Sequence, residues 1–255
     1  MPGFAASADF AIDKPAGQPC PHLGTDFGCT IHGQLRERGF AGCTVYDCFG
    51  AGQKVTHLAR GQRRGLFGAF TVTRQLHELL WYLSAALGYP AAEPYQARLS
   101  SLLQETERLT YEPAGLLTVL DVGAHRTQVN EVLRQVSTAA RSTSTGLRER
   151  RRRRATDPLD FPGADLMGRD LRLRRLQRAD LRGAYLLGAD LRGVDFALAD
   201  LLGADLRRAD VRSADLSRAL FLTQMQVNAA RGDAGTGLPD MIERPAHWSG
   251  SGAGP

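Results

Sequence analysis

The sequence has little of what a membrane, secreted or disulfide-rich protein needs. Its 255 residues include four cysteines, and no run reaches the ~18 uninterrupted apolar residues of a membrane helix. The longest candidate, residues 76–87, contains His77 and Glu78. The N-terminus carries Asp9 and Asp13 and lacks a basic region followed by an apolar core, so we expect no secretory signal. We therefore expect a cytoplasmic protein.

Catalytic patterns are also missing. We find no Ser/His/Asp order, no phosphate-binding loop and no recognisable pair of carboxylates. His57, His77 and His125 stand isolated in the sequence. We therefore expect that the protein is not an enzyme. An enzyme that used an N-terminal metal would need a labile water ligand on that metal.

The net charge of +5 comes from one short segment, residues 141–158, which we interpret as a linker. It holds seven arginines against Glu149 and Asp157, whereas the charges of residues 1–140 cancel. Such a run offers contacts to nucleic acid or another acidic surface. The alternative is a solvated run, because no aromatic residues interleave to stack bases. The five consecutive arginines are Arg150, Arg151, Arg152, Arg153 and Arg154.

Residues 54–140 have the periodicity of helices. Apolar residues recur at three- and four-residue steps around residues 76–83, in 95–109 and in 116–140. We expect a helical hairpin or small bundle whose apolar stripes form its core. These helices would pack on the flank of the C-terminal segment or form a homodimer through Trp81.

All four cysteines lie in the glycine-rich segment 20–53. In a reducing cytosol such a cluster is more often a metal or redox site than a disulfide framework. Thiolates and imidazoles are the ligands that Zn²⁺ prefers, and four of them close a structural site. Because the segment's glycines break regular elements, a bound metal would supply its order. The alternative is a set of small buried residues with free thiols. The candidate ligands are Cys20, Cys29, Cys43, Cys48, His22 and His32.

The phrase CPHL…D…CTIH…C…YDC resembles the second half of small Cys-rich domains of the CxxCxxCC type, thought to chelate zinc or iron. The paired cysteines that open that family's pattern are absent here. Their absence counts against a two-metal or cluster version and leaves one four-cysteine site, with His22 or His32 as substitute ligands. We expect Zn²⁺, with iron or an Fe–S cluster as the alternative.

Residues 159–223 repeat with a period of five. The residue before each repeat centre is Asp in ten repeats, and the residue before that is Ala in nine. Five residues advance an α-helix by ~140° net, and an odd step alternates the faces of a strand. The apolar centres are buried together only if the chain turns a corner every five residues, so that coils stack as in a solenoid. The centres are Phe161, Leu166, Leu171, Leu176, Leu181, Leu186, Leu191, Phe196, Leu201, Leu206, Val211, Leu216 and Phe221.

These A-D-L-x-x repeats resemble the pentapeptide-repeat family. The resemblance implies a right-handed quadrilateral β-helix with four repeats per coil, whose centre and preceding small residue point inward. The fold class is then α+β, with a Cys-rich segment and helices before a column only ~15 Å tall. Arg169 and Arg174 depart from the pattern, since they occupy the small inward position. A buried unpaired guanidinium is costly, so we expect that coil to be irregular or open to solvent.

The domain organisation expected is a flexible N-terminus (1–19), the Cys-rich segment (20–53), the helices (54–140), the linker (141–158), the repeats (159–223) and a tail (224–255). The tail would cap the last coil through Phe221, Leu222, Met225 and Val227, and its extreme end would be disordered. We expect a protein–protein interaction scaffold with an unidentified partner. The alternatives are a metal- or redox-responsive regulator and a DNA mimic that protects gyrase, although the repeats' net charge of +1 disfavours the mimic.

Overall fold

The computed structural model describes residues 3–7, 9–25, 28–35, 37–59, 66–142 and 160–248. The predicted contacts of Arg150–Arg154 and the end of the tail lie outside these residues. The chain forms two compact units, Met1–Ser84 with Ala97–Glu131 and Ala85–Gln96 with Val132–Pro255. These units cut across the boundaries expected from the sequence, because the end of the helical segment groups with the repeats. No helix in the described ranges is long and apolar enough to cross a bilayer.

The N-terminal part of the first unit folds around a small aromatic core. Phe4 and Lys14 exchange backbone hydrogen bonds, and the Phe4 ring stacks on Phe10 at 4.1 Å. Ile31, Leu35 and Phe40 form the buried centre of this core. Two short helices follow one another here, η1 (His32–Gln34) and α1 (Ala41–Val45). The side chains of Phe4 and Phe10 are partly buried against this core.

Five helices follow, and they match the predicted periodicity closely. They are α2 (Ala51–Ala59), α3 (Leu66–Leu87), α4 (Gln96–Leu109), α5 (Ala114–Leu117) and α6 (Val122–Ser142), with the 3₁₀ helix η2 (Pro90–Tyr95) before α4. In the first unit, Leu76 of α3, Leu109 of α4 and Val122 of α6 share one core. The single helix expected over 116–140 is broken, because Asp121 accepts the N–H of Ala124 and starts α6 anew.

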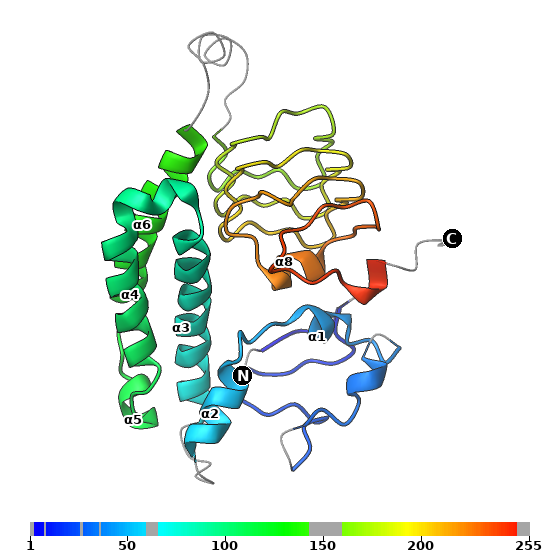
Figure 1. Ribbon diagram of the computed structural model, residues 1–255. Helices are drawn as coiled ribbons and strands as arrows, with labels where there is room; N and C mark the ends of the chain where they lie inside the picture. The colour runs from blue at the N-terminus through cyan, green and yellow to red at the C-terminus, as the bar shows by residue number, and fades with distance from the viewer. Residues whose placement is uncertain are drawn as a thin grey trace. The chain divides into compact units, whose positions relative to one another are not determined.

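The repeats of the second unit form coils of twenty residues that stack on one another (Figure 1). Eight single parallel bridges join residues before a repeat centre to their counterparts twenty residues later. Turns make up the rest, and among the described repeat residues no extended strand is assigned. The bridges define four faces. The first face is Asp160, Asp180, Asp200 and Leu220, the second is Asp165, Tyr185 and Asp205, the third is Asp170, Asp190 and Asp210, and the fourth is Asp195 and Asp215.

The inward positions behave as the repeat pattern predicts. Every predicted centre except Phe161 and Leu166 is buried. In most repeats the second residue after a centre has a positive φ, which is 62° at Gly183 and 59° at Leu198. Glycine is common there because it adopts this conformation without a steric cost. Arg169 and Arg174 are exposed, so the first coil avoids burying their guanidinium groups by opening to solvent at these positions.

The last part of α6 packs on the first face of the coils. Ser137 Oγ donates to Asp200 Oδ2 at 2.5 Å, and Arg141 donates to Asp160 at 2.8 Å. Tyr89 Oη accepts the N–H of Phe221 at 2.9 Å. The sequence predicted that the Asp residues of the repeats face solvent. Asp180 and Asp200 are instead buried, because the helix covers this face.

The tail caps and completes the last coil. The helix α8 (Gln224–Ala229) begins at Thr223, and Thr223 and Gln226 form a capping box. Bridges from Asp210 to Arg231 and from Asp215 to Gly237 continue the third and fourth faces. The spacing grows from 20 to 21 and then 22 residues, so the tail closes the column with a shifted register. A short 3₁₀ helix, η3 (Ala246–Trp248), ends the described chain.

Candidate interaction surface and cysteine cluster

The third face carries a neutral ladder of alternating charges. Arg172 contacts Asp170 at 2.7 Å and Asp190 at 3.3 Å, and Arg192 contacts Asp190 at 2.7 Å and Asp210 at 3.8 Å. Each arginine thus joins the aspartate two residues before it to the aspartate of the next coil. The hydrogen bond from Arg172 lowers the pKa of Asp170 to about 2. These aspartates are ionised and locally neutralised, so this face has no strong negative field.

The second face carries an exposed apolar patch, Met167, Tyr185 and Leu187. Tyr185 is 52% exposed and Met167 is 50% exposed, and Leu187 is half-buried. Backbone bonds hold them in neighbouring coils, since Gly168 N–H donates to the Leu187 carbonyl at 2.9 Å. Sequence analysis missed this patch. Alignment of the repeats at a period of twenty would reveal it, because Tyr185 then stands between two aspartates.

Three of the predicted metal ligands lie in one part of the N-terminal fold. Burial raises the pKa of the Cys43 thiol, and the nearby thiol groups of Cys20 and Cys29 raise it further. A bridge between Leu23 and Cys29 brings the two loops together. His22 lies edge-on to Phe40, with ring centroids 5.1 Å apart. Cys20, Cys29 and Cys43 therefore lie close enough to influence one another.

Cys48 lies apart from that grouping in its contacts, whereas His32 contacts it through the backbone of Cys29. Cys48 Sγ contacts Gln53 Oε1 at 4.0 Å, beside the start of α2. His32 starts η1, where its N–H donates to the Cys29 carbonyl at 3.2 Å. Within the described part of the chain, no three His, Cys, Asp or Glu side chains already converge as a metal-binding group. The donor chemistry fits zinc, but binding would require the thiols to turn toward a common point.

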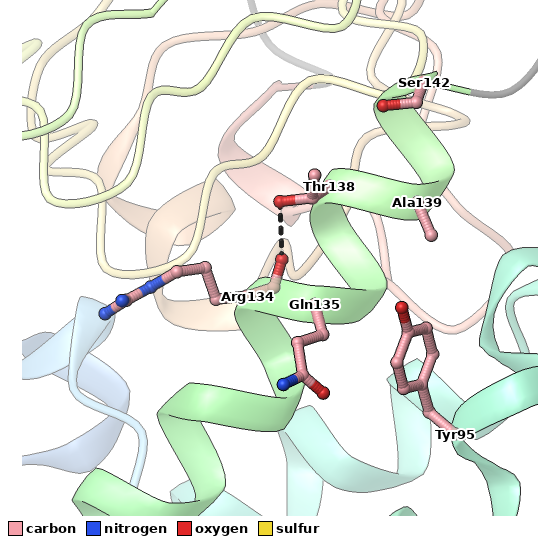
Figure 2. A pocket seen from close by; sticks show the side chains of 6 residues that line it. All are labelled: Tyr95, Arg134, Gln135, Thr138, Ala139 and Ser142. Atoms are coloured by element: carbon pink, nitrogen blue, oxygen red, sulfur yellow. Dashed lines mark hydrogen bonds between the residues drawn. The ribbon is translucent and has the colours of Figure 1, made fainter.

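An open pocket of about 310 Å³ lies beside the end of α6 (Figure 2). Tyr95 of η2 faces the α6 residues across it, and Thr138 Oγ1 donates to the Arg134 carbonyl at 2.9 Å. The Arg134 side chain extends away from the Tyr95 ring. No charged group is therefore aimed at the centre of the pocket, and we assign no ligand to it. Its lining residues are Tyr95, Arg134, Gln135, Thr138, Ala139 and Ser142.

Comparison with known proteins agrees with the repeat pattern. The family model for pentapeptide repeats matches residues 175–212 with eight copies. The uncharacterized protein YybG of Bacillus subtilis (strain 168) is 48% identical over 254 residues, which cover 96% of this chain and 88% of that protein. This chain belongs to the pentapeptide-repeat family. In this pentapeptide-repeat protein the match begins after Arg169 and Arg174, the two inward positions that depart from the pattern.

Proposed function

We propose that this pentapeptide-repeat protein is a protein–protein interaction scaffold. Its coils form a right-handed quadrilateral β-helix that presents side chains in fixed columns, one row per coil. The observation that carries the proposal is the apolar patch Met167, Tyr185 and Leu187, bordered by Asp165 and Asp205. Tyrosine and methionine are enriched in protein interfaces, and a polar rim around an apolar centre is typical of them. The neutral ladder on the third face argues against the DNA-mimic alternative.

The test replaces the centre of this patch. The variant Tyr185→Ser with Met167→Ser changes two exposed side chains and leaves the buried centres intact. Proximity labelling in the source cells, followed by titration of the recovered partner with purified chains, compares this variant with the wild type. We expect the partner to bind the wild type at least ~10-fold more tightly, the effect of losing one aromatic anchor.

The matched control is Met241→Ser, since Met241 is an exposed apolar residue of the tail with 57% exposure. This control should bind as the wild type does. If a partner binds the patch variant and the wild type equally, the interaction does not use the patch on the second face. A chain with no saturable protein partner would refute the scaffold function itself.

We also propose a structural metal in the N-terminal unit, held by Cys20, Cys29, Cys43 and His22, with Cys48 or His32 as the substitute ligand. Zn²⁺ would order loops that otherwise have only a small core. Elemental analysis of untagged protein, prepared without chelators, tests this proposal. We expect one zinc per chain in the wild type and its loss in Cys20→Ser with Cys43→Ser. Cys48→Ser tests whether the substitute ligand is needed for zinc binding. A metal-free wild type would contradict the site.

A regulator that responds to metal or oxidants is the second candidate, and the mutual influence of the Cys20, Cys29 and Cys43 thiols favours it. Iron with visible absorption bands, or reversible thiol oxidation that changes partner affinity, would place this function first. Zinc that resists oxidation would leave the cluster purely structural.

A further inference from the structure

The two ends of the coil stack differ in how they are closed. At the C-terminal end the tail takes up the edge of the last coil. The Gln226 side chain donates to the carbonyls of Leu201 at 2.7 Å and Ala204 at 2.9 Å, and Arg231 N–H donates to the Ala209 carbonyl at 2.8 Å. Trp248, also in the tail, is 2% exposed. This end has no open row of backbone groups at these positions.

The N-terminal end leaves its inward side chains partly exposed. Phe161, Ala164 and Leu166 occupy inward positions of the first coil, and all three are only half-buried. Their counterparts one coil later are 0% exposed: Leu181, Ala184 and Leu186. At this end the described residues therefore cover the apolar column only in part.

Among the described residues, this end also has backbone edge groups without a partner. In the second coil, Asp190 N–H donates to the Arg169 carbonyl at 2.8 Å and its carbonyl accepts the Leu171 N–H at 2.9 Å. Asp165 and Asp170 hold the same places in the first coil, and no described residue pairs with their backbone N–H or carbonyl groups. Such an edge is a template for another backbone.

The rim of this end carries both charges. Asp170 is 58% exposed, and Asp165, Arg169 and Arg175 are exposed beside it. Leu173 stands out from the rim with 98% exposure. Residues 160–179 hold three aspartates and five arginines, so acidic and basic groups lie side by side, and a surface with mixed charges complements a copy of itself.

We infer that the first coil of this protein pairs end to end with the first coil of a second copy. A two-fold axis would satisfy both backbone edges, cover both apolar columns and set acidic rim residues against basic ones. This interface shares Asp165 with the border of the patch on the second face, but their central residues differ, so either assignment can fail alone.

Sedimentation velocity of the full chain over a concentration series tests the pairing with two rim variants. One variant, Asp165→Arg with Asp170→Arg, makes the rim basic, and the other, Arg169→Asp with Arg175→Asp, makes it acidic. We expect a dimer for the wild type, monomers for each variant alone, and a one-to-one heterodimer when the two variants are mixed. Met241→Asp, in the tail, should leave the dimer intact.

Hydrogen exchange of the wild-type backbone amides of Asp165 and Asp170 keeps the proposal testable if a variant misfolds. Their exchange should slow as protein concentration rises. A wild type that stays monomeric, or a dimer that both rim variants preserve, would overturn the proposal. Protection of these amides at all concentrations in a monomer would also overturn it, because the chain itself would then cover the edge.

Discussion

Asp200 shows how one residue connects the helices to the repeats. It has 0% exposure, accepts the Ser137 hydroxyl and lies 3.5 Å from Arg182. Burial raises the pKa of this carboxyl, although Ser137 and Arg182 act in the opposite direction. Tyr89 lies nearby, and its burial raises its own pKa to about 12. The repeat pattern treats Asp200 like every other aspartate, whereas its environment makes it a buried polar anchor.

The first prediction removes the hydroxyl of Ser137. Ser137→Ala leaves Asp200 with one fewer donor in a buried site, so the free energy of unfolding should fall by about 1–3 kcal/mol. Urea denaturation measures the change. Thr138→Ala is the control, since Thr138 is exposed on the next position of α6 and should change little. Equal effects of the two substitutions would contradict the role of the buried contact.

The second prediction concerns pH. Because the folded pKa of Asp200 is raised, the folded chain holds this proton more tightly than the unfolded chain does. Relative to Asp200→Asn, the wild type should therefore lose stability as pH rises from about 3.9 through the raised folded value. For Asp215 the pH dependence of stability has the opposite sign. The Ser217 hydroxyl lowers its pKa, so its contribution is present above about 3.9 and is lost as pH falls. Denaturation of both Asn variants across pH 2–8 distinguishes the two signs, and parallel curves would refute the assignment.

At the scale of elements, a coil is stable because its centres stack in layers. Phe196 is 0% exposed and is among the largest fully buried side chains. Phe196→Ala should lower the free energy of unfolding by about 3–5 kcal/mol, since the cavity adds to the lost transfer energy. Met241→Ala, at an exposed position, should lie near zero. Calorimetry or denaturant titration gives both values, and a small loss at Phe196 would mean that the column collapses around the gap.

Sequence periodicity was enough to locate α4, α6 and most repeat centres, because each pattern has one geometry that buries its apolar residues together. It did not locate the break before α6, where the side chain of Asp121 decides the outcome locally. The fold around Phe4, Phe10 and Phe40 was also missed, since it has no periodicity. The thiol grouping was predicted as a set, whereas the separate contacts of Cys48 come from the start of α2.

At the scale of the whole molecule, the coil has a fixed unit of length. A tandem copy of residues 186–205 adds twenty residues, so an Asp200 stays twenty residues after Asp180 and keeps its place opposite Ser137. A tandem copy of residues 186–190 adds five. It moves Asp200 to the second face, above Tyr185, and sets Asp195 with its different neighbours opposite Ser137. We expect the longer insertion to fold cooperatively and the shorter one to be strongly destabilised, as measured by urea denaturation. Equal stability of the two would show that α6 does not read the register of the coil.

The shifted register of the tail has a consequence for how such a chain can change over generations. Similar five-residue repeats can be added to one another without limit. The bridges to Arg231 and Gly237 end the column, because their spacings are not multiples of five residues. Gene duplication is therefore free to lengthen the column upstream of this stop by whole coils, while the docking of α6 rejects partial ones. The tail fixes where the column ends, and the docking of α6 restricts its length to whole coils. The height of the column therefore changes in steps of one coil.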